Sequence, residues 1–110
     1  ELGDIVIAAR RLQERGISNV MVTLGGAGAV LVTSEGAWYA TAPAIKVKST
    51  VGAGDSSVAG FIIADVAGKS APECLASAVA YGSAAAGLPG STLPTPTDVH
   101  PGESRVSKLA

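Results

Sequence analysis

The feature that most constrains this chain is a glycine-rich turn that connects a strand-like segment directly to a helix-like segment. The turn is Thr50-Val51-Gly52-Ala53-Gly54-Asp55-Ser56. Before it, residues 45–48 alternate apolar and charged side chains, as in a strand with one solvent-facing side. After it, from residue 55 to about residue 67, apolar residues recur at helical spacing. The sequence therefore predicts an α/β protein in which a strand, a phosphate-binding turn and a helix are contiguous.

The residue types in this turn suit the transfer of a phosphoryl group. In that reaction negative charge spreads over the phosphate oxygens, and a protein helps mainly by placing fixed positive dipoles near them. The backbone N–H groups of Gly52, Ala53 and Gly54, with the positive end of the following helix, would supply those dipoles. Asp55 would then accept a proton from the attacking hydroxyl. A purely structural role is also open, because Asp often caps a helix after a glycine turn.

The rest of the chain predicts further helices and strands around this unit. Because residues 88–101 hold four of the six prolines, we expect that segment to be irregular. The adjacent aromatic residues Trp38 and Tyr39 should face opposite sides of a strand and serve in packing. The other predicted elements are, in chain order, a helix at 4–15, strands at 20–24, 29–33 and 38–40, and a helix that has Pro72 in its first turn and runs to about residue 86.

Composition limits the classes of partner and the compartment. The 110 residues are 47% hydrophobic, with a mean hydropathy of +0.39, which is enough for one domain with a core. Eight basic and nine acidic side chains give a formal charge of −1, so we expect no nucleic-acid or anionic-membrane partner. Cys74 is the only cysteine, which excludes an intramolecular disulfide and fits a reducing, cytoplasmic compartment. The longest apolar stretch, 58–67, is much shorter than the roughly 20 residues needed to span a bilayer.

A second glycine-rich turn narrows the functional interpretation of the first turn. Alone, Thr23-Leu24-Gly25-Gly26-Ala27-Gly28 is compatible with an ordinary hairpin. Together, in this order and with a β-hairpin between them, the two turns resemble the C-terminal part of the PfkB, or ribokinase-like, family of carbohydrate kinases. The resemblance continues through residues 56–61 and the alanine-rich segment 78–86. It implies that residues 1–110 are the C-terminal portion of a ribokinase-like three-layer α/β/α fold, with the sugar-binding part and the lid lying before Glu1.

The resemblance also implies roles for individual residues. Asp55 is the catalytic base, and Gly52, Ala53 and Gly54 form the anion hole. ATP would be bound with Mg²⁺, and the family's Asn-x-x-Glu magnesium motif would lie before Glu1. A K⁺ ion would be held by backbone carbonyls of Ser49, Val51, Ala85 and Gly90. The residues expected to border ATP are Thr23, Leu24, Gly25, Gly26, Ala27, Gly28 and Gly54, with Ser83 and Ala84 near the adenine.

Within the family, residues 49–56 and 36–38 are most similar to those of the 1-phosphofructokinases. The resemblance then implies phosphorylation of fructose 1-phosphate to fructose 1,6-bisphosphate. Another PfkB sugar kinase, acting on fructose 6-phosphate, tagatose 6-phosphate or ribose, is the alternative. Because the sugar-binding residues would lie upstream, we expect the 110-residue chain alone to be inactive, and the intact protein to form a homodimer through its lid.

Two other functions stay open on the sequence. Gly54-Asp55-Ser56 resembles the GDS-type esterases, with Ser56 as nucleophile and Asp98 and His100 as partners. The spacing of Asp98 and His100 differs from the Asp-x-x-His of that family. A non-catalytic relative that binds nucleotide without transferring phosphate is the other alternative, although retention of Asp55 argues against it.

Overall fold

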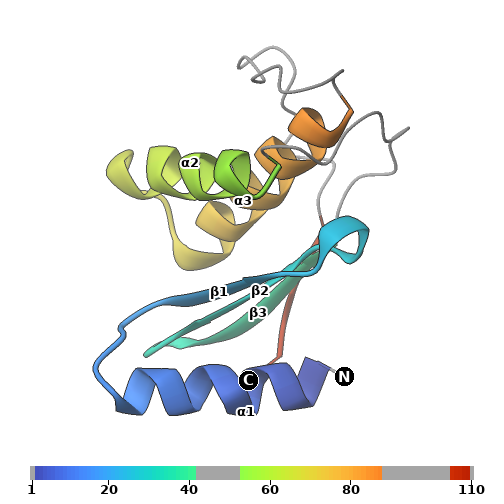
Figure 1. Ribbon diagram of the computed structural model, residues 1–110. Helices are drawn as coiled ribbons and strands as arrows, with labels where there is room; N and C mark the ends of the chain where they lie inside the picture. Colours follow the sequence, from blue (N-terminus) through green and yellow to red (C-terminus); the bar gives the residue numbers. More distant parts are fainter. Residues whose placement is uncertain (1, 42–52, 88–104, 110) are drawn as a thin grey trace.

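The computed structural model describes residues 2–41, 53–87 and 105–109, and these form three layers with a β-sheet in the middle. In Figure 1 helix α1 covers one face of the sheet and helices α2 and α3 lie on the other side. The sheet has the order β1-β2-β3-β4, and each neighbouring pair is antiparallel. The elements are α1 (Leu2–Glu14), β1 (Val20–Thr23), the short 3₁₀ helix η1 (Gly25–Ala27), β2 (Ala29–Thr33), β3 (Gly36–Thr41), α2 (Ala53–Val66), α3 (Ala71–Ala86) and β4 (Arg105–Lys108).

Alternation along β2 and β3 divides the core between the two faces of the sheet. Leu31 pairs with Trp38, and both belong to the cluster that packs against Leu75 and Val79 of α3. Val30 pairs with Tyr39 on the opposite face, in the cluster that contains Ala9 of α1. The expectation that the two adjacent aromatic residues face opposite sides is therefore confirmed, because successive strand residues point to opposite faces.

Helix α3 begins with a complete capping box. Ser70 Oγ accepts a hydrogen bond from the Glu73 backbone N–H, and the Glu73 carboxylate accepts one from the Ser70 N–H at 3.2 Å. Pro72 lies in the first turn, where a missing N–H costs nothing. The helix thus has Pro72 in its first turn and ends at Ala86, as predicted.

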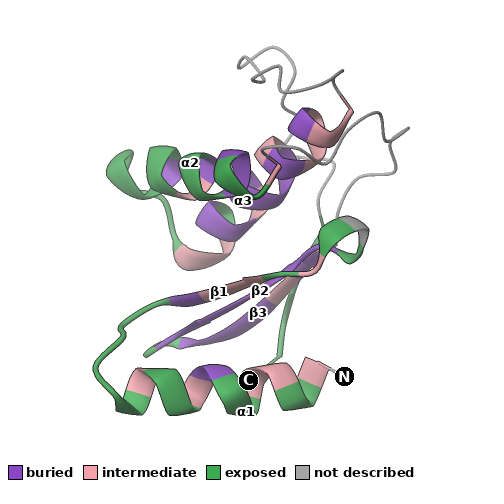
Figure 2. Ribbon diagram, in the orientation of Figure 1, coloured by how far each residue is buried: buried purple, intermediate pink, exposed green. Residues whose placement is uncertain are grey.

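Helix α2 differs from the sequence-based expectation in two respects. It begins at Ala53, so Ala53 and Gly54 belong to its first turn rather than to a loop before it. Of its apolar residues at helical spacing, only Phe61 packs against the core, where it is partly buried. Val58, Ile62 and Val66 are 50%, 53% and 81% exposed. The buried residues are small ones instead, namely Ser56, Ser57, Gly60 and Ala64 (Figure 2).

Small residues are buried on α2 because α3 comes very close to it. Ser77 Oγ donates a hydrogen bond to the Gly60 carbonyl at 2.8 Å. A Cβ added at Gly60 would lie 2.8 Å from the Ser77 carbonyl oxygen and 2.7 Å from the Tyr81 ring, closer than real Cβ atoms approach. Only glycine therefore fits at position 60 at this helix separation.

Strand β4 has no counterpart among the predicted elements. It pairs with β3, with Tyr39 opposite Ser107 and Ala40 opposite Val106. Only Val106 of its four residues is even partly buried, so it lacks the apolar alternation that marks a strand in a sequence. The predicted strand at 45–48 and the predicted irregular segment 88–101 lie outside the described residues.

Candidate functional site

The turn between β1 and β2 is closed by its own backbone. The Ala27 N–H donates to the Leu24 carbonyl at 3.1 Å, and the Gly28 N–H donates to the Gly25 carbonyl at 3.2 Å. The Leu24 N–H donates back to the Gly28 carbonyl at 2.8 Å. Thr23, Gly25 and Ala27 are exposed, so the outer side of this turn is open.

Two glycines of this turn adopt backbone conformations that other residues avoid. Gly25 has a φ of 58° and Gly28 a φ of 101°. Gly28 is also buried against β3, where an added Cβ would overlap the Ala40 carbonyl oxygen. Gly28 therefore holds the turn against the sheet, and this role is additional to the nucleotide contact predicted for it.

Tyr39 is a further anchor of the same turn. Its hydroxyl donates a hydrogen bond to the carbonyl oxygen of Ala27. The sequence predicted only a packing role for this side chain. The register of the β2–β3 hairpin is the signal from which its contact with the turn could have been inferred. Tyr39 lies opposite Val30, two residues after Gly28, so a long side chain on β3 can reach back to the turn.

The catalytic base predicted by the sequence lies at the exposed start of α2. Asp55 is the acidic residue of the first turn of α2, and both Asp55 and Gly54 are exposed. Among the described residues, and apart from the backbone of α2 itself, a Cβ added at Gly54 would meet no heavy atom within 4 Å. The first N–H groups of a helix have no partner within the helix, and they carry the positive end of its dipole.

The bounds of α2 change how the predicted anion hole would be built. Ala53 and Gly54 would present the N–H groups of a helix N-terminus, not those of a separate loop. Both arrangements place positive dipoles beside the Asp55 carboxylate. Gly52, the other residue predicted for the anion hole, lies outside the described residues.

The C-terminal part of α3 packs against this first turn of α2. A Cβ added at Gly82 would overlap Ser57 Oγ and would lie 3.4 Å from the Ala53 carbonyl oxygen. Ser83 and Ala84, predicted to lie near the adenine, follow Gly82 directly and are half-buried. The start of α2, the end of α3 and the η1 turn all lie toward the same end of the molecule (Figure 1). The described residues predicted to bind ATP are therefore gathered at that end.

Only one of the four predicted cation ligands lies among the described residues. Ala85 is buried on α3, whereas Ser49, Val51 and Gly90 lie outside the described part of the chain. Within the described ranges, no group of three or more His, Cys, Asp or Glu side chains could hold a metal ion.

Cys74 is buried, and this burial raises the pKa of its thiol, which suits an inert core residue.

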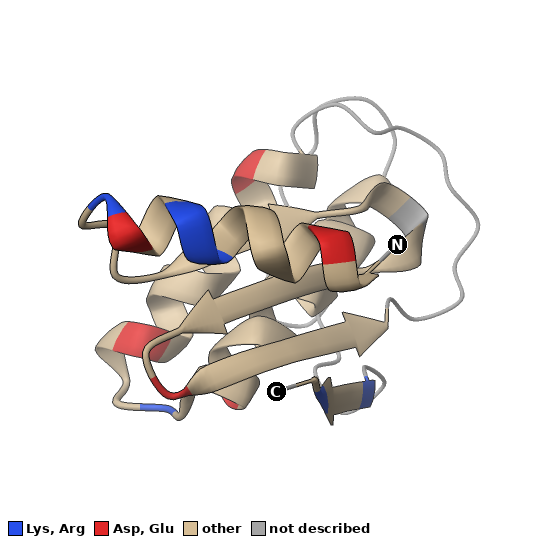
Figure 3. Cartoon of the chain, turned by 90° about the horizontal axis from the view of Figure 1, so that it is seen from below, with Lys and Arg blue, Asp and Glu red and all other residues tan. Residues whose placement is uncertain are grey.

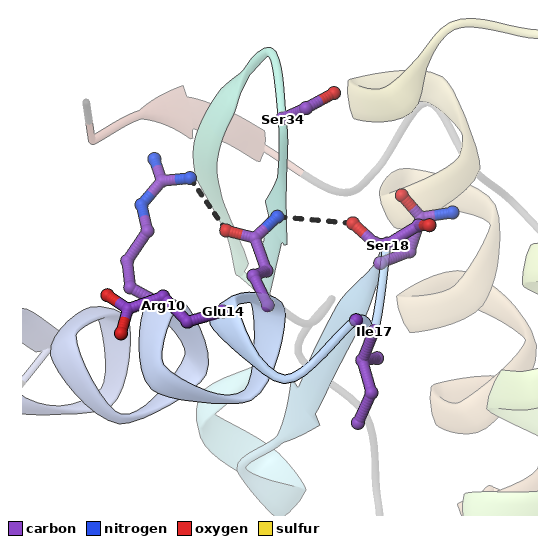
Figure 4. A pocket seen from close by; sticks show the side chains of 8 residues that line it. Arg10, Glu14, Ile17, Ser18 and Ser34 are labelled. Atoms are coloured by element: carbon purple, nitrogen blue, oxygen red, sulfur yellow. Dashed lines mark hydrogen bonds between the residues drawn. The ribbon is translucent and has the colours of Figure 1, made fainter.

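A hollow lined by Arg10, Gln13 and the loop after α1 lies at the other end of the β1–β2–β3 hairpins (Figure 4). Two of its polar side chains, Arg10 and Gln13, have hydrogen-bond partners that fix the loop after α1. Arg10 donates to Gln13 Oε1 at 2.9 Å and to the Thr33 carbonyl at 2.8 Å, and Gln13 donates to the Ser18 carbonyl at 3.1 Å. Thr33 is the last residue of β2, whereas the glycine turn lies just before the first residue of β2. This hollow is therefore separate from the candidate site.

The esterase interpretation fails at its nucleophile. Ser56 is only 4% exposed on the buried face of α2, whereas a catalytic hydroxyl must reach its substrate. Asp98 and His100 lie outside the described residues. Figure 3 shows acidic and basic residues interspersed along α1. Among the described helices, none is both long and apolar enough to cross a bilayer.

Known proteins with similar sequences are sugar-phosphate kinases. The model of the pfkB family of carbohydrate kinases matches residues 2–98. The chain is 48% identical over 62 residues to 1-phosphofructokinase of Escherichia coli K12, which covers 56% of this chain and 20% of that protein. It is 38% identical over 103 residues to 1-phosphofructokinase of Haloferax volcanii, which covers 94% of this chain and 34% of that protein.

Solved structures agree with this relationship. The structure of Escherichia coli phosphofructokinase-2 in complex with substrates and products matches with a TM-score of 0.81 and 36% identity, over 89% of this chain and 32% of that chain. The complex of phosphofructokinase-2 with potassium matches with a TM-score of 0.83 and 35% identity, over the same shares of the two chains.

In all of these comparisons the chain spans about a third or less of the other protein's length. None of these relatives supports the esterase interpretation. The family model extends over both glycine turns and over every described helix, and the similar solved structures have the same α/β architecture. The chain belongs to the PfkB family of carbohydrate kinases.

Proposed function

We propose that this chain is the catalytic and ATP-binding third of a sugar-phosphate kinase. The observation that carries the proposal is the exposed Asp55 in the first turn of α2, beside the open position of Gly54. A carboxylate and a helix N-terminus at one place provide a proton acceptor and an anion site together. The match of residues 2–98 to the family supports the same chemistry.

In the proposed reaction the sugar hydroxyl attacks the terminal phosphorus of ATP. Asp55 accepts the hydroxyl proton, a new oxygen–phosphorus bond forms, and ADP leaves with the electrons of the broken bond. The N–H groups of the first turn of α2 stabilise the charge on the transferring phosphoryl group. Gly54 would leave room for that group, because no atom of the described neighbouring elements lies within 4 Å of a Cβ at this position.

Metal ions enter the proposal only through the family. Mg²⁺ supplies charge neutralisation of the ATP phosphates in such kinases. The described residues contain no cluster that fits a metal ion, so we assign no Mg²⁺ ligand to this chain. A K⁺ ion near Ala85 is supported only by the potassium complex of Escherichia coli phosphofructokinase-2.

For the acceptor we propose fructose 1-phosphate, because the relatives from Escherichia coli and Haloferax volcanii are both 1-phosphofructokinases. Fructose 6-phosphate is the second candidate, supported by the similarity to phosphofructokinase-2. The test measures ATP-dependent turnover of the intact protein with fructose 1-phosphate, fructose 6-phosphate, tagatose 6-phosphate and ribose. The highest kcat/KM with fructose 1-phosphate would support the first candidate, and no turnover with any sugar would refute the kinase proposal.

We further propose that the intact protein works in the cytoplasm as a homodimer and that the 110-residue chain is inactive alone. The chain covers at most about a third of its relatives, which supports the second statement. Turnover by the 110-residue chain would contradict it, and sedimentation of the intact protein as a monomer would contradict the first.

A further inference from the structure

We propose that Tyr39 is a positioning residue for the nucleotide, because its hydroxyl fixes the turn on which ATP would lie. This inference rests on the kinase function proposed above. Its starting point is the hydrogen bond that Tyr39, on β3, donates to the carbonyl of Ala27, the last residue of η1. Tyr39 itself is not placed in contact with ATP, so its effect is exerted through the turn.

Such an anchor matters because the turn is rich in glycine, the residue with the most conformational freedom to lose. Gly25 and Gly28 both adopt positive φ, and glycine loses more conformational freedom on ordering than any other residue. An unanchored turn would lose that freedom when ATP binds, which weakens binding. A turn that is already ordered avoids this cost.

Two adjacent residues of β3 provide the order. Ala40 contacts the turn through its carbonyl oxygen, which leaves no space for a side chain at Gly28. Tyr39 engages the preceding residue, Ala27, through its hydroxyl. The peptide group between Ala27 and Gly28 is thus held on both sides, since the Gly28 N–H also donates to the Gly25 carbonyl.

The two parts of the Tyr39 side chain can be separated by experiment. The ring is partly buried against the cluster that contains Val30 and Ala9, so it contributes to the core. The hydroxyl reaches beyond that cluster to the exposed turn. Tyr39→Phe keeps the ring and removes only the bond to Ala27, and Tyr81→Phe, which changes the other tyrosine on α3, is the matched control.

The test uses the intact kinase and measures steady-state kinetics, the Kd of a non-hydrolysable ATP analogue by calorimetry, and Tm. We expect Tyr39→Phe to raise the KM for ATP and the Kd of the analogue about 2- to 10-fold, the usual effect of one lost hydrogen bond. The kcat, the KM for the sugar and Tm should stay close to those of the wild type. Tyr81→Phe should leave the KM for ATP unchanged.

Unchanged ATP binding in Tyr39→Phe would overturn the inference while leaving the kinase function intact. A fall in kcat and Tm without a selective change in ATP binding would also overturn it, because a structural role alone predicts that pattern. A wild-type protein that neither binds the analogue nor phosphorylates a sugar would instead refute the proposed function.

Discussion

Gly82 of α3 lies directly against Ser57 of α2, so that any Cβ at position 82 would overlap the Ser57 hydroxyl oxygen. The same hydroxyl donates a hydrogen bond to the Ala53 carbonyl at 3.1 Å. Ala53 is the first residue of α2, two positions before Asp55. The contact between the helices therefore fixes the first turn of α2, which carries the proposed base.

Gly82→Ala should disturb this turn. The added methyl group must displace Ser57 or move the helices apart, which typically costs about 1–3 kcal/mol of stability. We expect a lower Tm and, in the intact enzyme, a lower kcat. Gly3→Ala is the control, because a Cβ at this helical position in α1 meets no atom within 4 Å. Equal Tm values for the two variants would contradict the close contact seen here.

The sequence predicted the presence of α2 well and its buried face poorly. Apolar spacing around Val58 and Ile62 indicated a helix, and the helix exists. Which face of a helix is buried depends on what packs against it, and a single sequence does not specify that partner. Here α3 is close enough that Gly60, Ser56 and Ser57 are buried. Val58, Ile62 and Val66 stay exposed, and Phe61 is only partly buried.

Glu73 should make the stability of α3 dependent on pH. Hydrogen bonds from the Ser70 side chain and then from the Ser70 backbone hold the pKa of Glu73 below its ordinary value of 4.5. Between the lowered folded-state pKa and 4.5 the unfolded chain binds more protons, so stability rises with pH across that window. The contribution is complete above 4.5 and is lost as the pH falls through the folded-state pKa.

The measurement is Tm against pH for the wild type and Glu73→Gln. The amide keeps a hydrogen-bonding side chain in the cap but does not titrate, so the difference in Tm between the two proteins should shrink as the pH falls below 4.5. Glu35→Gln, at the exposed turn between β2 and β3, is the control and should follow the wild type. A difference that does not change with pH would show that the carboxylate charge has no part in the cap.

Gly54→Val should block the proposed phosphate site without destabilising the fold. Because a Cβ at Gly54 contacts no neighbouring atom, we expect stability to change by less than about 1 kcal/mol. In the intact enzyme the larger side chain would occupy the space proposed for the phosphoryl group, so turnover should be abolished. Gly3→Val is matched to it, as each glycine is the second residue of its helix. A folded Gly54→Val enzyme with normal turnover would exclude the proposed anion site.

The candidate site can be proposed from the sequence because phosphate chemistry restricts the residue types in its two glycine turns. The packing around these turns has no comparable sequence pattern. The anchors of these turns were not predicted as such. The hydroxyl of Tyr39 and the space at Gly82 act across long sequence distances, and their partners become apparent only when the strands and helices are assembled.

Asp55→Asn is the most direct test of the proposed chemistry. Asparagine has nearly the same shape but cannot accept the hydroxyl proton, so kcat should fall by about two to four orders of magnitude. Asp55 is exposed, and its substitution should leave Tm and ATP affinity nearly unchanged. Asp65→Asn controls for the loss of one negative charge, since Asp65 is an exposed carboxylate near the other end of the same helix. Near-normal turnover in Asp55→Asn would remove Asp55 as the base, and an equal loss in Asp65→Asn would indicate a general effect of charge on α2.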